Sequence, residues 1–165
     1  IAGKHLDNEI IRSVRDELKL HIGEPTAEEI KIAVGSAVPQ EERLEVAVRG
    51  RDVTTGLPKE IGIKDIQVRS WLVRSLRFIV ENLKDLIESA PPELVGDIYR
   101  NGIYMCGGGS CLRGIDQLIG REIGVGVKIV DDPLVCVARG TGIVAENLAG
   151  HEQLLNNFTQ VNVEK

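Results

Sequence analysis

The stretch of the sequence that decides the fold is Ile103-Tyr104-Met105-Cys106-Gly107-Gly108-Gly109-Ser110-Cys111-Leu112-Arg113-Gly114. Its apolar run predicts a buried strand over 102–106, and the glycines predict a turn into a helix over 111–123 with Ser110 as the N-cap. Glycines carry no Cβ, so backbone N–H groups in the turn can approach a ligand closely. The start of the helix adds unpaired N–H groups and a positive dipole end. Open α/β sheets bind nucleotides at turns of this kind.

The same turn has a second interpretation, in which it is merely tight and empty. No Lys follows the glycines to hold a phosphate, and neither the dinucleotide signature nor the P-loop signature is present. If a nucleotide binds here, we expect the turn to contact its sugar and base rather than its phosphates.

Composition narrows the class of protein. The 165 residues are 42% hydrophobic and 27% charged, which predicts one packed domain or two small ones. The net charge of −5 and the lack of basic clusters interleaved with aromatics argue against a nucleic-acid partner. No apolar run is long enough to predict a membrane span. Three cysteines without a framework or zinc spacing fit a reducing compartment and no metal site. Because the first residue is Ile1, we expect a piece of a longer protein.

Hydrophobic periodicity predicts helices over residues 7–20, 65–89, 93–100 and 134–148, the last with Asp132 as its N-cap. A capping box from Thr26 to Glu29 predicts a further short helix. Runs over residues 30–38, 43–51 and 57–64 predict an antiparallel meander, because short links join them. A strand over 126–130 should lie parallel to the strand at 102–106.

These elements divide the chain into three parts. Residues 1–25 and 91–150 form an α/β subdomain, which we expect to be incomplete. Residues 26–90 form an outer subdomain with the meander and the long helix. Residues 151–165 form a polar tail.

Several motifs in one register, from about residue 1 to 148, resemble the MreB family of bacterial actins. They are IGEPTAEEIK at 22–31, RGRD at 49–52, TGLPK at 55–59, PPEL at 91–94, GGGSCLRG at 107–114 and DDPLVCVARGTG at 131–142. The resemblance implies an α/β fold of the actin-like ATPase (ribonuclease H-like) type. It also implies that this chain is most of the second of two lobes, with ATP in the cleft between the lobes.

The resemblance further implies a role. Members of the family polymerise into filaments at the cytoplasmic face of the inner membrane and determine rod cell shape by guiding cell-wall synthesis. The expected partners are therefore copies of the protein itself, the inner membrane and cell-wall synthesis proteins, with no nucleic acid.

The resemblance also assigns adenosine-facing residues by position. In the glycine turn they are Gly107, Gly108, Gly109, Ser110, Leu112 and Arg113. In the capped segment, Glu28 would accept from ribose hydroxyls and Lys31 would lie over the base. From the spacing alone, the preferred explanation of Glu28 and Lys31 is a surface ion pair worth a few tenths of a kcal/mol.

Groups that the family uses for phosphate chemistry lie before Ile1 in the family's order. These groups are the two phosphate-binding hairpins, the acidic residue that positions the attacking water, and the metal site. We therefore assign no catalytic or metal residue. We expect that this chain does not hydrolyse ATP and that it binds ATP weakly or not at all. Mg²⁺ is expected only in the full-length protein. Strands 102–106 and 126–130 would also have a bare edge, which predicts self-association.

Other classes remain open at this point. The chain could belong to another bacterial actin, such as the division protein FtsA or the pilus protein PilM, although RGRD and TGLPK fit MreB better. A sugar kinase on the same fold would need a catalytic acid and a sugar-binding insertion, and neither is visible. A pure interaction module without a nucleotide role is the remaining alternative.

Overall fold

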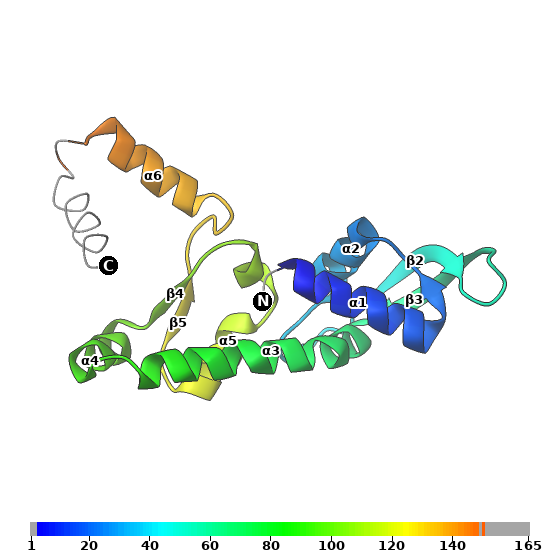
Figure 1. Cartoon of the computed structure of the whole chain (residues 1–165), viewed down its shortest axis with the longest axis horizontal. Coiled ribbons are helices and arrows are strands. Elements are labelled where there is room, and N and C mark those ends of the chain that lie inside the picture. Colours follow the sequence, from blue (N-terminus) through cyan, green and yellow to red (C-terminus); the bar gives the residue numbers. More distant parts are fainter. Residues whose placement is uncertain (1–2, 149, 151–165) are drawn as a thin grey trace, which may run out of the picture.

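The helix α3 (Asp65–Glu88) runs along much of the length of the molecule and connects its two ends (Figure 1). The computed structural model describes residues 3–148 and 150. Helices α1 and α2 and an antiparallel sheet pack against the N-terminal half of α3. A parallel strand pair and two short helices, α4 and α5, lie toward its C-terminal end (Figure 1). The polar tail expected over 151–165 lies outside the described residues.

The main core is built where α1 (Gly3–Leu18) packs against α2 (Glu24–Val34) and α3. Ile10 and Val14 of α1, Ile30 of α2 and Leu72 of α3 are fully buried there. Each such side chain contributes about 1.5–3 kcal/mol relative to leaving it in water. The amphipathic stripes that predicted helices over 7–20 and 65–89 are thus confirmed.

The strand expected over residues 30–38 is wrong, because most of this segment belongs to α2. Ala27, Ile30 and Val34 are buried at helical spacing, while Ile32 between them is 69% exposed. The expected capping box is also wrong. The helix begins at Glu24, two residues before Thr26, and Gly23 is the N-cap without a side-chain hydrogen bond.

The antiparallel sheet has the order β1 (Leu20–His21), β2 (Glu45–Asp52), β3 (Pro58–Lys64). The hairpin of β2 and β3 confirms the strands expected over 43–51 and 57–64, with Val46 opposite Ile63. The third strand is the two-residue β1, where Leu20 lies opposite Asp52, instead of the expected segment 30–38.

Helix α4 (Pro92–Asn101) begins at a proline, as expected for the segment 93–100, and leads to β4 (Ile103–Met105). Strand β4 pairs in parallel with β5 (Val127–Ile129), which confirms the predicted parallel pair. Each of these strands has one other edge, and neither edge is paired within the described residues.

The helix expected to begin at residue 111 begins later, as α5 (Ile115–Ile123). Gly114 is left-handed, with φ of 72°, so no helix can pass through it. Before it lies a short 3₁₀ turn, η1 (Gly108–Cys111). Ser110 is therefore not an N-cap, and its hydroxyl instead donates to the carbonyl of Gly107 at 2.7 Å.

The last helix of the described residues, α6 (Cys136–Glu146), is shorter than the expected 134–148. Asp132 has φ of 49° and lies in a turn before the helix. The prediction that Asp132 is the N-cap is therefore wrong. Helix α6 projects away from the rest of the described chain (Figure 1) and contains no buried residue. Leu134, Val137 and Ile143 on and beside it are exposed. This part of the fold presents apolar surface that the described residues do not cover.

None of the helices in the described residues combines the length and the apolar character needed to cross a bilayer.

Candidate functional site

The glycine turn after β4 has an unusual backbone that its sequence explains. Gly107 adopts φ 80° and ψ 171°, a conformation essentially restricted to glycine. Its N–H donates to the carbonyl of Pro133 at 2.7 Å, and the Ser110 hydroxyl and N–H both donate to its carbonyl. Ser110 is 1% exposed. The serine thus holds the turn in shape and its hydroxyl does not face solvent.

The glycines themselves face open space. A Cβ added to Gly107 or Gly109 would meet no atom within 4 Å, and one added to Gly108 would meet only Leu134 Cδ2, at 3.4 Å. Gly108 and Gly109 are exposed. The turn therefore presents bare backbone at the surface, which a flat ligand could approach closely.

Beyond the turn, the chain is joined to the end of α2. Ser36 and Arg113 form an isolated parallel β-bridge, in which Ala37 N–H donates to the Arg113 carbonyl at 2.8 Å. Arg113 Nη2 donates to the carbonyls of Ile32 (3.1 Å) and Ala33 (2.6 Å). These are carbonyls of the last turn of α2, where a cation complements the helix dipole.

Leu112 packs beneath this junction. It is buried in the core, and a Cβ on Gly35 would lie 3.1 Å from its Cδ1. Leu112 and Arg113 therefore join the glycine turn to α2, and neither side chain is presented as a free surface group.

Lys31 has a partner that the sequence did not suggest. Its Nζ lies 2.8 Å from Asp7 Oδ1 of α1, and both side chains are mostly buried, at 16% and 11% exposure. Glu28 lies one turn earlier on α2 and is exposed. The surface ion pair between Glu28 and Lys31 is absent from the described contacts, because Asp7 takes the lysine. One signal was visible in the sequence, since Asp7 lies on the same helical stripe as Ile10 and Val14.

A second polar cluster supports the junction from the side of α3. Asp65 is 1% exposed, and its Oδ2 lies 3.4 Å from Arg69 Nη1, which also donates to the Ser36 hydroxyl at 3.4 Å. The Asp65 N–H donates to the carbonyl of Leu44. Sequence analysis missed this cluster, because its members are brought together only by packing.

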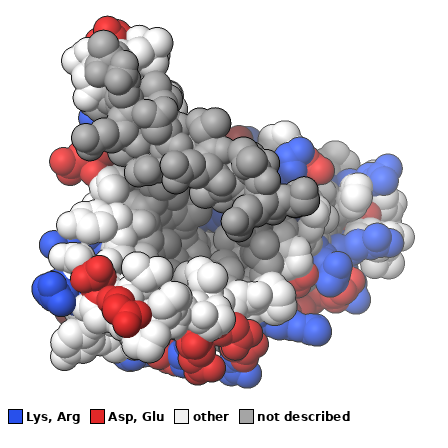
Figure 2. Space-filling model, turned by 60° about the vertical axis from the view of Figure 1, so that its left-hand side comes forward, with Lys and Arg blue, Asp and Glu red and all other residues white. Residues whose placement is uncertain are grey.

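The charges on the visible face are mixed. Figure 2 shows Lys and Arg beside Asp and Glu at the rim, with uncharged residues between them. Among the described residues that this view shows, basic and acidic side chains are thus interspersed.

The structure thus brings Lys31, Leu112 and Arg113 together around the end of α2. The glycine turn at 107–110 is held separately, because the Gly107 N–H donates to the carbonyl of Pro133. Glu28 lies on the exposed face of α2, one turn before Lys31. The arrangement is an open wall with bare glycine backbone and a mostly buried lysine.

Comparisons with known proteins agree with this fold. The family model described as MreB/Mbl protein matches residues 1–153. The chain is 41% identical to the cell shape-determining protein Mbl of Bacillus subtilis (strain 168) over 148 residues, covering 90% of this chain and 44% of Mbl. It is 40% identical to the cell shape-determining protein MreB of Escherichia coli (strain K12) over 151 residues, with 92% and 44% covered.

Solved structures give the same architecture. MreB 5 of Spiroplasma citri bound to AMPPNP matches with a TM-score of 0.87 and 37% identity, over 93% of this chain and 46% of that one. The MamK double helical filament matches with a TM-score of 0.72 at 23% identity, over 88% and 44%, which is evidence for the fold alone.

The molecule is therefore part of an actin-like fold. The chain belongs to the MreB/Mbl family, as the motifs at 22–31, 107–114 and 131–142 predicted. It spans 44% of the length of the curated relatives quoted above. The division into residues 1–25 with 91–150 and residues 26–90 stays a prediction.

Proposed function

We propose that this chain is the second-lobe part of an ATP-binding, actin-like protein that determines rod cell shape. The observation that carries the proposal is the open glycine backbone at 107–109, joined through Arg113 to α2 in a chain of the MreB/Mbl family. We infer the role in cell shape from the names of the relatives, and we infer the class of ligand from the AMPPNP bound to MreB 5.

In this proposal the glycine turn and α2 form one wall of a cleft for adenosine. Gly107, Gly108 and Gly109 let the base or ribose approach the backbone. Glu28 is exposed and free to accept from ribose hydroxyls. The ion pair of Lys31 with Asp7 joins α2 to α1 beside the wall. Ser110, Leu112 and Arg113 hold the wall in shape.

Hydrolysis and Mg²⁺ binding need groups that the described residues of the wall do not supply. Phosphoryl transfer depends on positioning water and neutralising phosphate charge. We therefore expect no ATP hydrolysis by the 165-residue chain alone and weak ATP binding or none.

Self-association follows from the same fold. Within the described residues the β4–β5 pair has unpaired edges, and Leu134, Val137 and Ile143, on and just before α6, are exposed. Bare edges and apolar surface recruit other chains. We propose that in the whole protein these features contribute to assembly with further copies, at the cytoplasmic face of the inner membrane and with cell-wall synthesis proteins.

The test uses Mbl of B. subtilis in which this chain replaces the matching part. We expect this hybrid to bind a fluorescent ATP analogue and to restore cell shape in cells lacking Mbl. Gly109→Ala should weaken binding by about tenfold or more, since a methyl group then stands where the ligand approaches and each 1.4 kcal/mol is a factor of ten.

The matched control is Gly96→Ala. Gly96 in α4 also has nothing within 4 Å of an added Cβ, so this methyl group is tolerated too. If Gly109→Ala and Gly96→Ala hybrids bind the analogue with equal affinity, the glycine turn is not the adenosine wall.

A further inference from the structure

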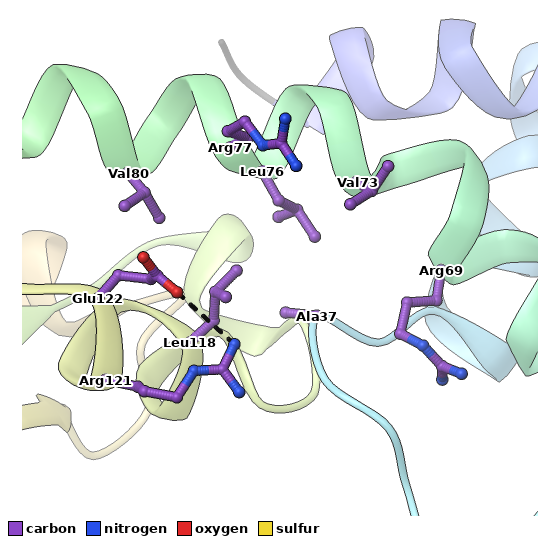
Figure 3. Close-up of a pocket in the computed structure, with 9 residues that line it drawn as sticks. All are labelled: Ala37, Arg69, Val73, Leu76, Arg77, Val80, Leu118, Arg121 and Glu122. Atoms are coloured by element: carbon purple, nitrogen blue, oxygen red, sulfur yellow. Dashed lines mark ion pairs between the residues drawn. The ribbon is translucent and has the colours of Figure 1, made fainter.

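A hollow of about 330 Å³ lies between α3 and α5 (Figure 3). Val73, Leu76 and Val80 of α3 form one wall, and Leu118 of α5 and Ala37 form the other. Leu76 and Val80 point from α3 toward α5 in Figure 3. The volume lies at the lower end of the range for small-ligand sites, about 300–1,000 Å³. Aliphatic side chains thus line both walls, and the hollow is of a size for a small molecule.

The rim of this hollow is positively charged, although the whole chain carries −5. Arg69, Arg77 and Arg121 line it, with Glu122 as the acidic residue among the lining side chains. Glu122 is shared, because Arg121 lies 3.8 Å from it and Lys84 lies 3.3 Å from it.

The three arginines differ in how far they are already neutralised. Arg69 lies 3.4 Å from the buried carboxylate of Asp65. Arg77 has no ion-pair partner within 4.0 Å among the residues that the structure describes. Within the described part of the chain, the one ion-pair partner of Arg121 is Glu122, which it shares with Lys84. Two guanidinium groups thus have unused donors at the rim of an apolar hollow.

We propose that this hollow binds a small organic acid with an apolar body, of the aryl or alkyl carboxylate class. The apolar body packs against Val73, Leu76 and Leu118. The carboxylate lies at the rim, where Arg77 from α3 or Arg121 from α5 offers the planar paired donors that match its two oxygens. A ligand of this kind touches both α3 and α5, so its binding stabilises the packing of the two helices on each other.

The test is calorimetric titration of the full chain with phenylbutyrate, beside phenylbutanol and inorganic phosphate. We expect one site for phenylbutyrate and at least about tenfold weaker binding of the alcohol, which lacks the charge. Inorganic phosphate, which lacks the apolar body, should bind weakly or not at all. Equal affinity for phenylbutanol would mean that the arginines do not contribute to binding. Equal affinity for phosphate would mean that the apolar walls do not contribute. Either result, or no binding of phenylbutyrate, overturns the proposal.

Variants place the site. The double variant Arg77→Gln/Arg121→Gln should weaken phenylbutyrate binding by about tenfold or more, while Arg51→Gln, an exposed arginine on β2, should leave it unchanged. Val73→Trp should abolish binding by filling the hollow. Val73 is 52% exposed, so the larger side chain is accommodated, and circular dichroism verifies the fold of each variant. Equal binding by the double variant and Arg51→Gln, or unchanged binding by Val73→Trp, places the ligand elsewhere and contradicts the proposal.

Discussion

Ser36 and Arg113 form a parallel β-bridge across 77 positions of sequence, and this bridge joins α2 to the chain that leaves the glycine turn. The Arg113 side chain extends the same junction by donating to the carbonyls of Ile32 and Ala33. Ser36, in turn, accepts from Arg69 of α3. Three elements that are distant in sequence therefore meet at one point, and several measurable consequences follow from its chemistry.

Arg113→Met should lower the free energy of unfolding by about 1–2 kcal/mol. Bonds from a charged donor are worth about 1.5–3 kcal/mol, but Arg113 Nη1 is buried without a partner, which offsets part of the gain. Urea denaturation measures the change. Arg100→Met is the control, since Arg100 is exposed and lies 3.8 Å from Asp97, and we expect a change within about 0.5 kcal/mol. Equal effects of the two variants would show that Arg113 does not fasten α2.

The pair of Asp7 and Lys31 should behave as a buried ion pair. Lys31→Met leaves the Asp7 carboxylate without its cation and should cost about 3–5 kcal/mol of unfolding free energy, as should Asp7→Leu. The double variant Asp7→Leu/Lys31→Met should be more stable than either single variant, because no buried charge is left unpaired.

A double-mutant cycle from urea denaturation measures the coupling between the two side chains. If the two single effects simply add, the 2.8 Å contact carries no energy and Lys31 is free to reach a ligand.

Sequence patterns located the long amphipathic helices and the β2–β3 hairpin, because these depend on spacing within one segment. They failed for α2, where Ile30, Ile32 and Val34 read as a β-branched strand although Ile32 faces solvent. They also misplaced the start of α5. The left-handed Gly114 follows the bridge at Arg113, and that bridge depends on Ser36, which no local pattern includes. For the candidate site, the turn at the glycines was predicted, whereas the long-range contacts of Lys31 with Asp7 and of Ser36 with Arg69 were not.

Gly107→Ala should destabilise the chain, whereas Gly109→Ala should not. Neither added methyl group meets an atom within 4 Å, so the two differ only in backbone conformation. Gly107 has φ 80° and ψ 171°, which costs a residue with a Cβ about 1–3 kcal/mol. Thermal unfolding followed by circular dichroism measures both variants. An unchanged melting temperature for Gly107→Ala would mean that the turn can adopt another conformation.

Asp52 makes the stability of the β2–β3 hairpin depend on pH. Its carboxylate accepts from Lys59 Nζ at 2.9 Å and from the N–H groups of Thr54 and Thr55, and these bonds, the one from Lys59 foremost, hold the pKa of Asp52 well below its usual range. Because the folded-state pKa is lowered, the stabilisation is present above the unfolded pKa of about 3.9 and is lost as the pH falls below it.

Asp52→Asn keeps an oxygen for the threonine N–H groups but removes the charge, so it isolates this effect. We expect Asp52→Asn to unfold at lower urea concentration than the original chain near pH 7, with the difference shrinking as the pH falls below about 4. In a Lys59→Met background the effect of Asp52→Asn at neutral pH should be smaller, because the principal partner of the carboxylate is gone. A difference in urea midpoint that stays constant from neutral to acid pH would show that the charge of Asp52 does not stabilise the hairpin.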